Sequence, residues 1–203
     1  SIDGGTEQDL IRGGDGDDTL YGNGGYDILD GGAGADSIWG GTEDDIIFGR
    51  QGDDTINGNG GNDSIRGGKG NDYLQGGQDA DYFLGDDDND ILLGNLGADS
   101  LYGGDGDDTI YGNEDDDILS GGKGNDTLYG GISNDNIRGG QDDDELHGEA
   151  GDDLLQGDLG TNILYGGEGN DRFNIKRADG NVDIIKDFEI TNLQERIDIT
   201  NFT

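Results

Sequence analysis

The sequence predicts an all-β solenoid in which 18-residue coils stack into two facing parallel sheets. A nine-residue unit, Gly-x-x-x-x-Asp-x-(apolar)-x, repeats nineteen times from Gly4 to Asn174 without an insertion or deletion. Position one is Gly in all nineteen copies, position six is Asp in all except the copy with Asn162, and position eight is always Ile, Leu or Phe. Such a fixed period is typical of repeat proteins, whose units bury a core only by stacking.

Positions seven to nine are predicted to form a short strand in each copy. Segments such as Thr19-Leu20-Tyr21 and Thr109-Ile110-Tyr111 have the β-branched and aromatic residues that strands prefer. Because side chains alternate along a strand, position eight faces the core and positions seven and nine face outward. Positions one to six are rich in Gly, Asn and Asp, which favour tight turns.

Two copies make one coil, so alternate copies stack as neighbouring parallel strands. One sheet is expected to bury Ile11, Leu29, Ile47, Ile65, Phe83, Leu101, Leu119, Ile137, Leu155 and Phe173. The other is expected to bury Leu20, Ile38, Ile56, Leu74, Leu92, Ile110, Leu128, Leu146 and Leu164.

The composition indicates that this fold needs a cation. The chain has 45 Gly, no Cys, 48 Asp plus Glu against 11 Lys plus Arg, and a net charge of -37. Low hydrophobicity with high net charge is typical of disorder in water. One buried apolar side chain per copy contributes about 1.5–3 kcal/mol, whereas ordering the backbone costs about 1–2 kcal/mol per residue. Such a chain also repels nucleic acid, and its longest apolar runs, of three residues, are too short to span a bilayer.

The position-six carboxylates are the candidate ligands of that cation. Stacking places them in two columns at one strand spacing, where bare like charges repel each other. One column holds Asp9, Asp27, Asp45, Asp63, Asp81, Asp99, Asp117, Asp135, Asp153 and Asp171; the other holds Asp18, Asp36, Asp54, Asp72, Asp90, Asp108, Asp126, Asp144 and Asn162. Oxygen ligands without His or Cys favour Ca²⁺. Asn162 lacks a charge, so the pair with Asp144 is the expected weakest site.

The copies Gly13–Tyr21, Gly67–Gln75, Gly103–Tyr111 and Gly121–Tyr129 match the pattern G-G-x-G-x-D-x-U-x at every fixed position. The chain thus resembles the RTX, or haemolysin-type, calcium-binding nonapeptide-repeat family over residues 1–174. The resemblance implies a right-handed parallel β-roll with Ca²⁺ between consecutive turns. It implies about 17 internal sites, built from position-six carboxylates and turn carbonyls such as those of Gly13, Gly14, Gly16, Gly67, Gly68, Gly70, Gly103, Gly104, Gly106, Gly121, Gly122 and Gly124.

Both ends differ from the array. Ser1-Ile2-Asp3 reads as positions seven to nine of a preceding copy, so we expect the array to continue upstream. Residues 175–203 are similar to the segment that closes many RTX rolls, with Glu195 where that segment has Asp. We expect a C-terminal cap there, within a region that carries a type I secretion signal in the family. The expected cap contacts are Phe173, Ile175, Ile185, Phe188, Ile197 and Ile199.

The first functional hypothesis is a calcium-binding structural module of a secreted bacterial protein that is extracellular or at the cell surface. The module would fold on binding Ca²⁺ outside the cell. It would thereby stabilise its parent protein or aid the export of that protein through type I secretion machinery. The alternative is a module that binds glycan or a surface layer through an outward sheet face, with Tyr21, Trp39, Tyr111, Tyr129 and Tyr165 at position nine and Thr19, Ser37, Thr55, Thr109 and Thr127 at position seven. Cross-strand pairing also explains those aromatics.

No catalytic residues are expected in this chain. His147 stands alone at an outward position nine, without a second His, a Cys or a His-Glu-x-x-His motif. The Gly-rich turns lack the Lys-Ser/Thr of a phosphate-binding loop. Tyr82, Leu84, Ile91 and Leu93 suggest one exposed apolar patch near the middle of the rod.

Overall fold

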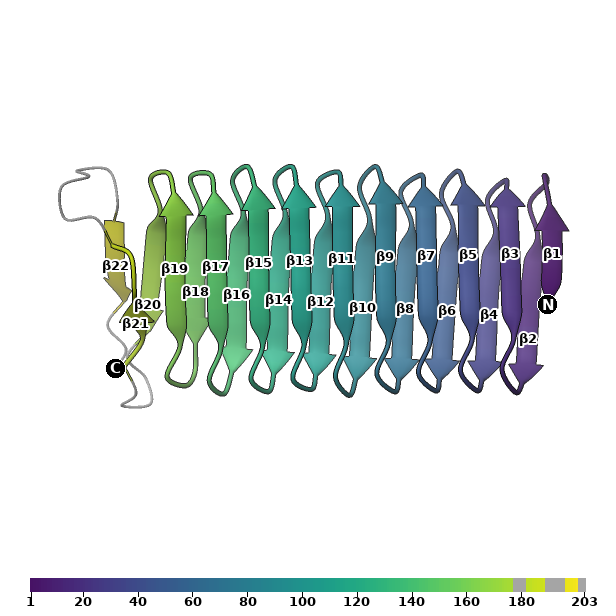
Figure 1. Cartoon of the computed structure of the whole chain (residues 1–203), viewed down its shortest axis with the longest axis horizontal. Helices are drawn as coiled ribbons and strands as arrows, with labels where there is room; N and C mark the ends of the chain where they lie inside the picture. The colour runs from purple at the N-terminus through teal and green to yellow at the C-terminus, as the bar shows by residue number, and fades with distance from the viewer. Residues whose placement is uncertain (177–181, 189–195, 201–203) are drawn as a thin grey trace.

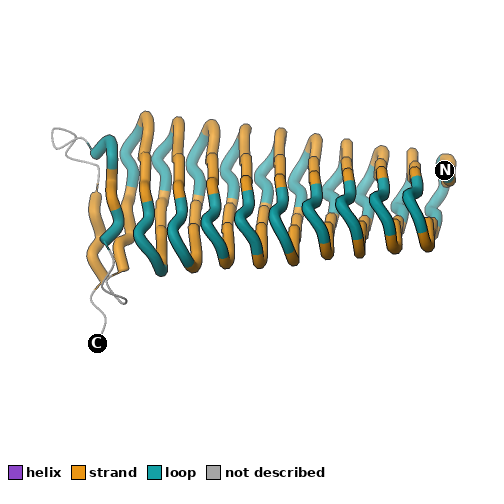
Figure 2. Tube along the Cα trace, turned by 60° about the horizontal axis from the view of Figure 1, so that its bottom comes forward, coloured by secondary structure: helices purple, strands orange, loops and turns teal. Residues whose placement is uncertain are grey.

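The computed structural model is an all-β rod in which the chain winds steadily from one end to the other (Figures 1 and 2). It describes residues 1–176, 182–188 and 196–200. Within those ranges the chain forms 22 strands and two sheets of 11 strands each. The described part of the chain holds no helix long and apolar enough to cross a membrane.

The odd-numbered strands form one sheet, here called the odd sheet, and the even-numbered strands form the even sheet. The odd sheet contains β1 (Ile2–Gly5), β3 (Thr19–Gly24), β5 (Ser37–Thr42), β7 (Thr55–Gly60), β9 (Tyr73–Gln78), β11 (Ile91–Leu96), β13 (Thr109–Glu114), β15 (Thr127–Ile132), β17 (Glu145–Ala150), β19 (Ile163–Glu168) and β21 (Ile184–Ile185). The even sheet contains β2 (Leu10–Asp15), β4 (Ile28–Ala33), β6 (Ile46–Gln51), β8 (Ser64–Lys69), β10 (Tyr82–Asp87), β12 (Ser100–Asp105), β14 (Ile118–Lys123), β16 (Asn136–Gln141), β18 (Leu154–Asp158), β20 (Arg172–Lys176) and β22 (Arg196–Thr200).

Each strand of the array pairs in parallel with the strand one coil later. Leu20 is the partner of Ile38, and Ile38 is the partner of Ile56, so the register advances by the predicted 18 residues. Parallel pairing of like positions explains why the repeat tolerates no insertion, because one added residue would turn every following side chain to the opposite face. The predicted fold class, a parallel β-roll of 18-residue coils, is confirmed.

The strands are longer than the three residues predicted. β3, for example, covers positions seven to nine of one copy and positions one to three of the next. Gly22, at position one, is buried, and the register of β3 with β5 passes from the Tyr21–Trp39 pair to the Asn23–Gly41 pair without a pair at position one. The three-residue prediction is wrong because glycine at position one does not form a turn but continues the strand along the core.

Positions two and four hold the unusual backbone conformations. All position-two residues have positive φ, including Arg50 at 89° and Asp86 at 82°. At position four, Glu43 and Ser133 also have positive φ, at 67° and 92°. Except for Glu7 in the first copy, non-glycine residues at these positions therefore keep the same turn geometry, at the cost of backbone strain that glycine avoids.

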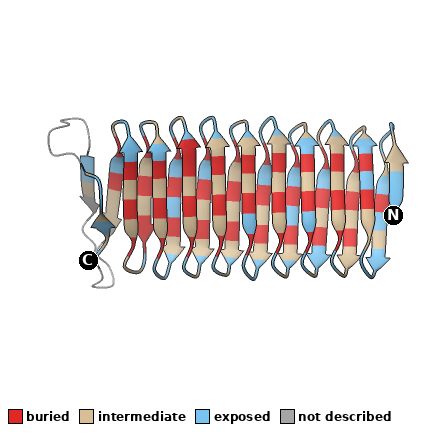
Figure 3. Cartoon of the chain, in the orientation of Figure 1, coloured by how far each residue is buried: buried red, intermediate tan, exposed pale blue. Residues whose placement is uncertain are grey.

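The core is a double column of the position-eight side chains. All nineteen form one cluster, and even Ile11, the most exposed of them, is only 5% exposed. The predicted inward sets of both sheets are confirmed, and bands of buried residues run along the rod in Figure 3. The expected mid-rod patch is wrong as a single surface. Tyr82 and Leu84 lie on β10 of the even sheet, whereas Ile91 and Leu93 lie on β11 of the odd sheet.

The C-terminal segment extends both sheets. β21 pairs with β19 and β22 pairs with β20. Ile175, Ile185 and Phe188 pack against the core as expected, and the ring of Phe188 meets Phe173 edge-on at 6.1 Å. Ile197 aligns with Phe173 but stays 42% exposed. Glu195 and the side chain of Ile199 lie outside the described part.

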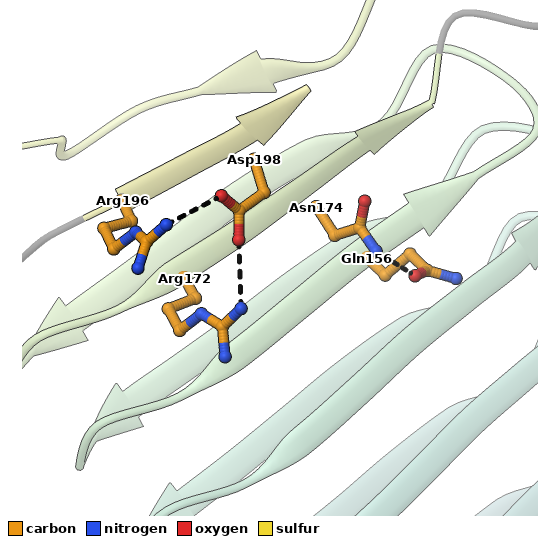
Figure 4. Close-up of polar contacts among 5 residues, drawn as sticks. All are labelled: Gln156, Arg172, Asn174, Arg196 and Asp198. Atoms are coloured by element: carbon orange, nitrogen blue, oxygen red, sulfur yellow. Dashed lines mark hydrogen bonds and ion pairs between the residues drawn. The ribbon is translucent and has the colours of Figure 1, made fainter. Parts of the chain in front are cut away.

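Polar side chains tie the last strands of the even sheet together (Figure 4). Asp198 on β22 accepts hydrogen bonds from Arg172 at 3.0 Å and from Arg196 at 3.4 Å. Asn174 on β20 donates to Gln156 on β18 at 2.7 Å. The Arg172–Asp198 and Asn174–Gln156 contacts cross from strand to strand on the outer face of the sheet, whereas Arg196 and Asp198 both lie on β22. β22 is therefore held to β20 by a side-chain contact as well as by the ladder.

Candidate metal centre

The position-six carboxylates lie inside the roll, at the turn that precedes each strand. From Asp27 onward the predicted aspartates are 1–3% exposed, and Asn162 is fully buried, whereas Asp9 and Asp18 in the first coil are half-buried. The side chains of each column are joined through the backbone. From Asp27 onward, Oδ1 of each residue accepts the backbone N–H of the position-six residue one coil earlier, as Asp72 does from Asp54 at 2.8 Å.

The second carboxylate oxygen has no such partner. In fifteen of the position-six aspartates Oδ2 is buried and has no hydrogen-bond partner among the described residues. The fifteen are Asp27, Asp36, Asp45, Asp54, Asp63, Asp72, Asp81, Asp90, Asp99, Asp108, Asp117, Asp126, Asp135, Asp144 and Asp153. A buried ionised oxygen left without a hydrogen bond or a counter-charge is strongly unfavourable. In the folded chain each of these Oδ2 atoms therefore needs a bound proton or a nearby cation.

A small space beside each Oδ2, here called the cradle, is kept open by the position-one glycine. A Cβ added to Gly40 would lie 2.5 Å from Oδ2 of Asp45 and 2.8 Å from the carbonyl oxygen of Gly58, one coil later. Gly40 has no positive φ, so it is required by close approach and not by its conformation. Two oxygens from consecutive coils thus converge on the space that a side chain would fill.

The predicted carbonyl ligands fall into two groups. The position-one carbonyls of Gly67, Gly103 and Gly121 converge in this way with Oδ2 of Asp54, Asp90 and Asp108. Carbonyl oxygens at positions two and four instead lie against the equivalent glycine one coil later: a Cβ added to Gly32 would lie 2.1 Å from the oxygen of Gly14, and one added to Gly34 would lie 2.7 Å from that of Gly16. The described residues contain no group of three or more His, Cys, Asp or Glu side chains that could hold a metal. Main-chain carbonyls would therefore have to complete any cation site.

Burial changes the protonation of these groups. Burial, together with the nearby carboxylates of Asp63 and Asp99, raises the pKa of Asp81 to about 8, against the lowering effect of the N–H of Asp63. Asp45, nearer the N-terminal end, has its pKa raised to about 6, again chiefly by burial. The metal-free aspartates from Asp45 to Asp153 thus hold protons near neutral pH, as expected of crowded buried carboxylates.

Position five carries a second set of side chains that the sequence analysis missed. Asp or Asn occupies thirteen of the nineteen copies. In many of them Oδ1 accepts the backbone N–H of position five one coil later, as Asp107 does from Asn125 at 2.7 Å. Position-six carboxylates accept an N–H from the preceding coil, whereas position-five side chains accept one from the following coil. Two neighbouring residues of one turn therefore bind the coils on either side of it. The excess of Asp and Asn at position five was the signal available in the sequence.

Charged residues at position two were also unexplained by the repeat pattern. Arg50 donates two hydrogen bonds of 3.0 Å to Asp30, and Arg66 and Arg138 pair with Asp86 and Asp158. Each pair is separated by 20 residues and joins position nine to position two of the next coil. Complementary charges at this spacing were the signal, and they tie adjacent even strands on the outer face.

The last turn of the second column has a different chemistry. Asn162 accepts the N–H of Asp144 through Oδ1 at 2.9 Å, as an aspartate would. Its amide nitrogen, however, donates to Oδ1 of Asp183 at 2.8 Å, and its carbonyl accepts the N–H of Ile184 at 2.7 Å. Asp183 thus occupies the place of the next position-six residue in this column, although it follows Asn162 by 21 residues and not by 18. The loss of period after Asn174 hid this role.

The family described as RTX calcium-binding nonapeptide repeat (4 copies) matches residues 1–29, 30–65, 57–92, 84–119, 93–128, 111–146 and 138–173. The chain belongs to this family. RTX repeats bind Ca²⁺, and the oxygen-only donor set and open cradles described above fit that ion. This RTX chain is therefore a calcium-binding module with a structural, non-catalytic fold, of a kind typically found in secreted bacterial proteins. No curated protein matches it.

Proposed function

We propose that Ca²⁺ binding between consecutive turns folds this RTX module. The observation that carries the proposal is the set of fifteen buried Oδ2 atoms without hydrogen-bond partners. In the unfolded chain these carboxylates are hydrated and repel one another, so folding requires a counter-charge. Ca²⁺ accepts six to eight oxygen ligands with flexible geometry, which suits carboxylates and carbonyls contributed by two coils.

The proposed ligands are the position-six carboxylates of both columns, with the position-one carbonyls beside them. Consecutive members of the columns define about 17 internal sites. That number of Ca²⁺ ions would contribute about +34 against the net charge of -37. The Asp144–Asn162 site is the weakest of the set, because the amide nitrogen of Asn162 already has an acceptor in Asp183.

The biological role follows from where Ca²⁺ is abundant. Weak extracellular sites work at about 10⁻⁴–10⁻³ M Ca²⁺, so the chain would be disordered in a Ca²⁺-poor cytosol and fold after export. Folding outside would help to draw the chain through a type I exporter and would stabilise a domain attached to the module. The segment 175–203 serves in this proposal as the C-terminal cap of the roll formed by residues 1–174.

Far-UV circular dichroism during a Ca²⁺ titration tests the proposal, with Mg²⁺ as the control. The expected result at pH 7.5 is a cooperative coil-to-β transition with Ca²⁺ only, because Mg²⁺ demands octahedral geometry and retains its water. A chain that is fully β-structured in chelator at this pH would overturn it.

The outward aromatics do not favour the glycan-binding alternative. Tyr111, Tyr129, His147 and Tyr165 form one stack with centroid spacings of 4.9, 4.7 and 4.5 Å and interplanar angles of 5–15°. Each inner ring is covered on both faces by its neighbours, so it offers a sugar only an edge. The stack supports cross-strand pairing instead. Glycan retention lost in Tyr111→Ala/Tyr129→Ala with the fold intact would restore the alternative.

A further inference from the structure

The outer face of the odd sheet differs in charge from the rest of this acidic molecule. From β3 to β15, positions seven, nine and two provide 21 outward residues, and none is charged. They are Thr19, Tyr21, Asn23, Ser37, Trp39, Gly41, Thr55, Asn57, Asn59, Tyr73, Gln75, Gly77, Ile91, Leu93, Asn95, Thr109, Tyr111, Asn113, Thr127, Tyr129 and Gly131. We call this set the neutral face.

The even sheet provides a matched comparison. The same three positions from β4 to β16 include five charged residues, namely Asp30, Arg50, Arg66, Asp86 and Arg138. Two hollows of about 320 and 540 Å³ also indent this side of the rod, each lined partly by Lys or Arg and Asp. Repeat geometry alone therefore does not make an outer face uncharged, since both sheets share it.

Side chains on the neutral face are held in place by one another. The rings of Tyr21 and Trp39 stack at 5.0 Å, and those of Tyr111 and Tyr129 at 4.9 Å. Between these pairs, Asn57 donates to Gln75 at 3.2 Å, and Gln75 donates to the hydroxyl of Tyr73 at 3.2 Å. Ordered side chains lose little entropy on binding, which favours association.

We propose that the neutral face is a self-association surface that pairs two calcium-loaded copies of this chain face to face. Interface centres are depleted in charged residues and enriched in Tyr and Trp, as this face is. A two-fold axis brings the same patch of both copies together. Pairing through this face brings no charges together, whereas pairing through the even sheet would desolvate ion pairs such as Arg50–Asp30 and Arg66–Asp86.

The area of the neutral face is sufficient for a stable dimer. Seven strands at about 4.8 Å and five residues per strand at about 3.3 Å, from position seven to position two, give a surface of about 34 by 17 Å. Two such faces would bury roughly 1,100 Å² together, above the approximately 1,000 Å² expected of a specific interface. The proposal rests on the calcium-dependent fold proposed above, because only the loaded rod is close to neutral.

Sedimentation velocity in saturating Ca²⁺ tests the pairing, at about 1–200 μM protein. The expected result is a mass that rises from monomer to dimer, with circular dichroism unchanged throughout. Trp39, the one tryptophan of the chain, lies on the neutral face. Its emission should shift to shorter wavelength as the dimer forms. A monomer at every concentration, or a dimer with unchanged Trp39 emission, would overturn the proposal even where calcium folds the chain.

A matched pair of variants locates the interface. Asn57→Glu/Leu93→Glu places two charges on β7 and β11 of the neutral face, and should weaken dimerisation at least tenfold. Leu84→Glu/Ser120→Glu places them at the same repeat position on β10 and β14 of the even sheet, and should leave it unchanged. Equal effects of the two variants would contradict the assignment. Neutral glycan that binds a strictly monomeric rod and quenches Trp39 would also overturn it.

Discussion

The uniform array and its last C-terminal turn complete the same backbone arrangement with different chemistry. In the array, Asp144 accepts the N–H of Asp126 at 3.0 Å through Oδ1, while its Oδ2 has no hydrogen-bond partner among the described residues. One coil later, Asn162 accepts the N–H of Asp144 and donates to Asp183. A neutral amide therefore joins two coils without help, whereas a carboxylate needs a proton or a cation.

The largest expected effect is that of pH on the metal-free array. Burial raises the pKa of Asp72 and Asp81 to about 7 and 8, from about 3.9 in an unfolded chain. The fold binds protons more tightly than the unfolded chain, so its stability is greatest below about pH 4 and is lost as pH rises through about 6–8. Circular dichroism in chelator should show more β-structure at pH 4.5 than at pH 8; the reverse order would contradict this account. With Ca²⁺ present, protons compete, and calcium affinity should fall with pH.

A methyl group in the cradle should have the next largest effect. Gly40→Ala places a Cβ 2.5 Å from Oδ2 of Asp45 and 2.8 Å from the carbonyl of Gly58, and should cost about 3 kcal/mol as overpacking. Gly60→Ala is the control, because no atom lies within 4 Å of its added Cβ and its φ is not positive. Denaturant unfolding in Ca²⁺ measures both. Similar losses of unfolding free energy in the two variants would show that close contact with Asp45 and Gly58 is not the reason for glycine at position 40.

Removal of one carboxylate should affect two sites at once. Asp72→Ala takes away a shared ligand and the acceptor for the N–H of Asp54, at a cost of about 2 kcal/mol for the unsatisfied group. Calorimetric titration should show fewer bound Ca²⁺ ions per chain and a higher Ca²⁺ concentration at the midpoint of binding. Unchanged stoichiometry and midpoint would refute the shared-ligand arrangement.

Replacement of Asn162 in the last turn by the Asp found in the rest of the array should have a smaller effect. Asn162→Asp replaces the amide donor to Asp183 with an acceptor, and should destabilise the metal-free fold by about 1–2 kcal/mol. It should also raise the number of bound Ca²⁺. Asn89→Asp adds the same charge at an exposed position five, where Oδ1 of either residue can accept the N–H of Asp107, and is the control. If both variants behave alike, the contrast between array and final turn reflects charge alone.

The smallest effect is expected at position five. Asp107→Ala removes an exposed acceptor of the N–H of Asn125 and should cost about 0.5–1 kcal/mol without loss of Ca²⁺. Ala98→Asp makes the reciprocal change and should stabilise by a similar amount. A loss of bound Ca²⁺ in Asp107→Ala would instead assign position five to the metal sites.

The sequence alone predicted the fold class, the buried position-eight residues and the alignment of the position-six carboxylates in two columns. These features follow from a strict period, because equal spacing places equal residues above one another. The strand length was mispredicted, since glycine at position one signals close approach to Asp and carbonyl oxygens and not a turn. Propensity describes a residue by itself, whereas this role depends on the neighbouring coil.

Only the tertiary structure decided which atoms meet. It directs one oxygen of each buried Asp to a backbone N–H and leaves the other beside a carbonyl, as between Asp45 and Gly58. It also brings Asp183 to Asn162 across 21 residues, an offset that no 18-residue period contains. The period determines which residues are neighbours, but the direction of their polar atoms depends on packing and on the hydrogen bonds that packing allows.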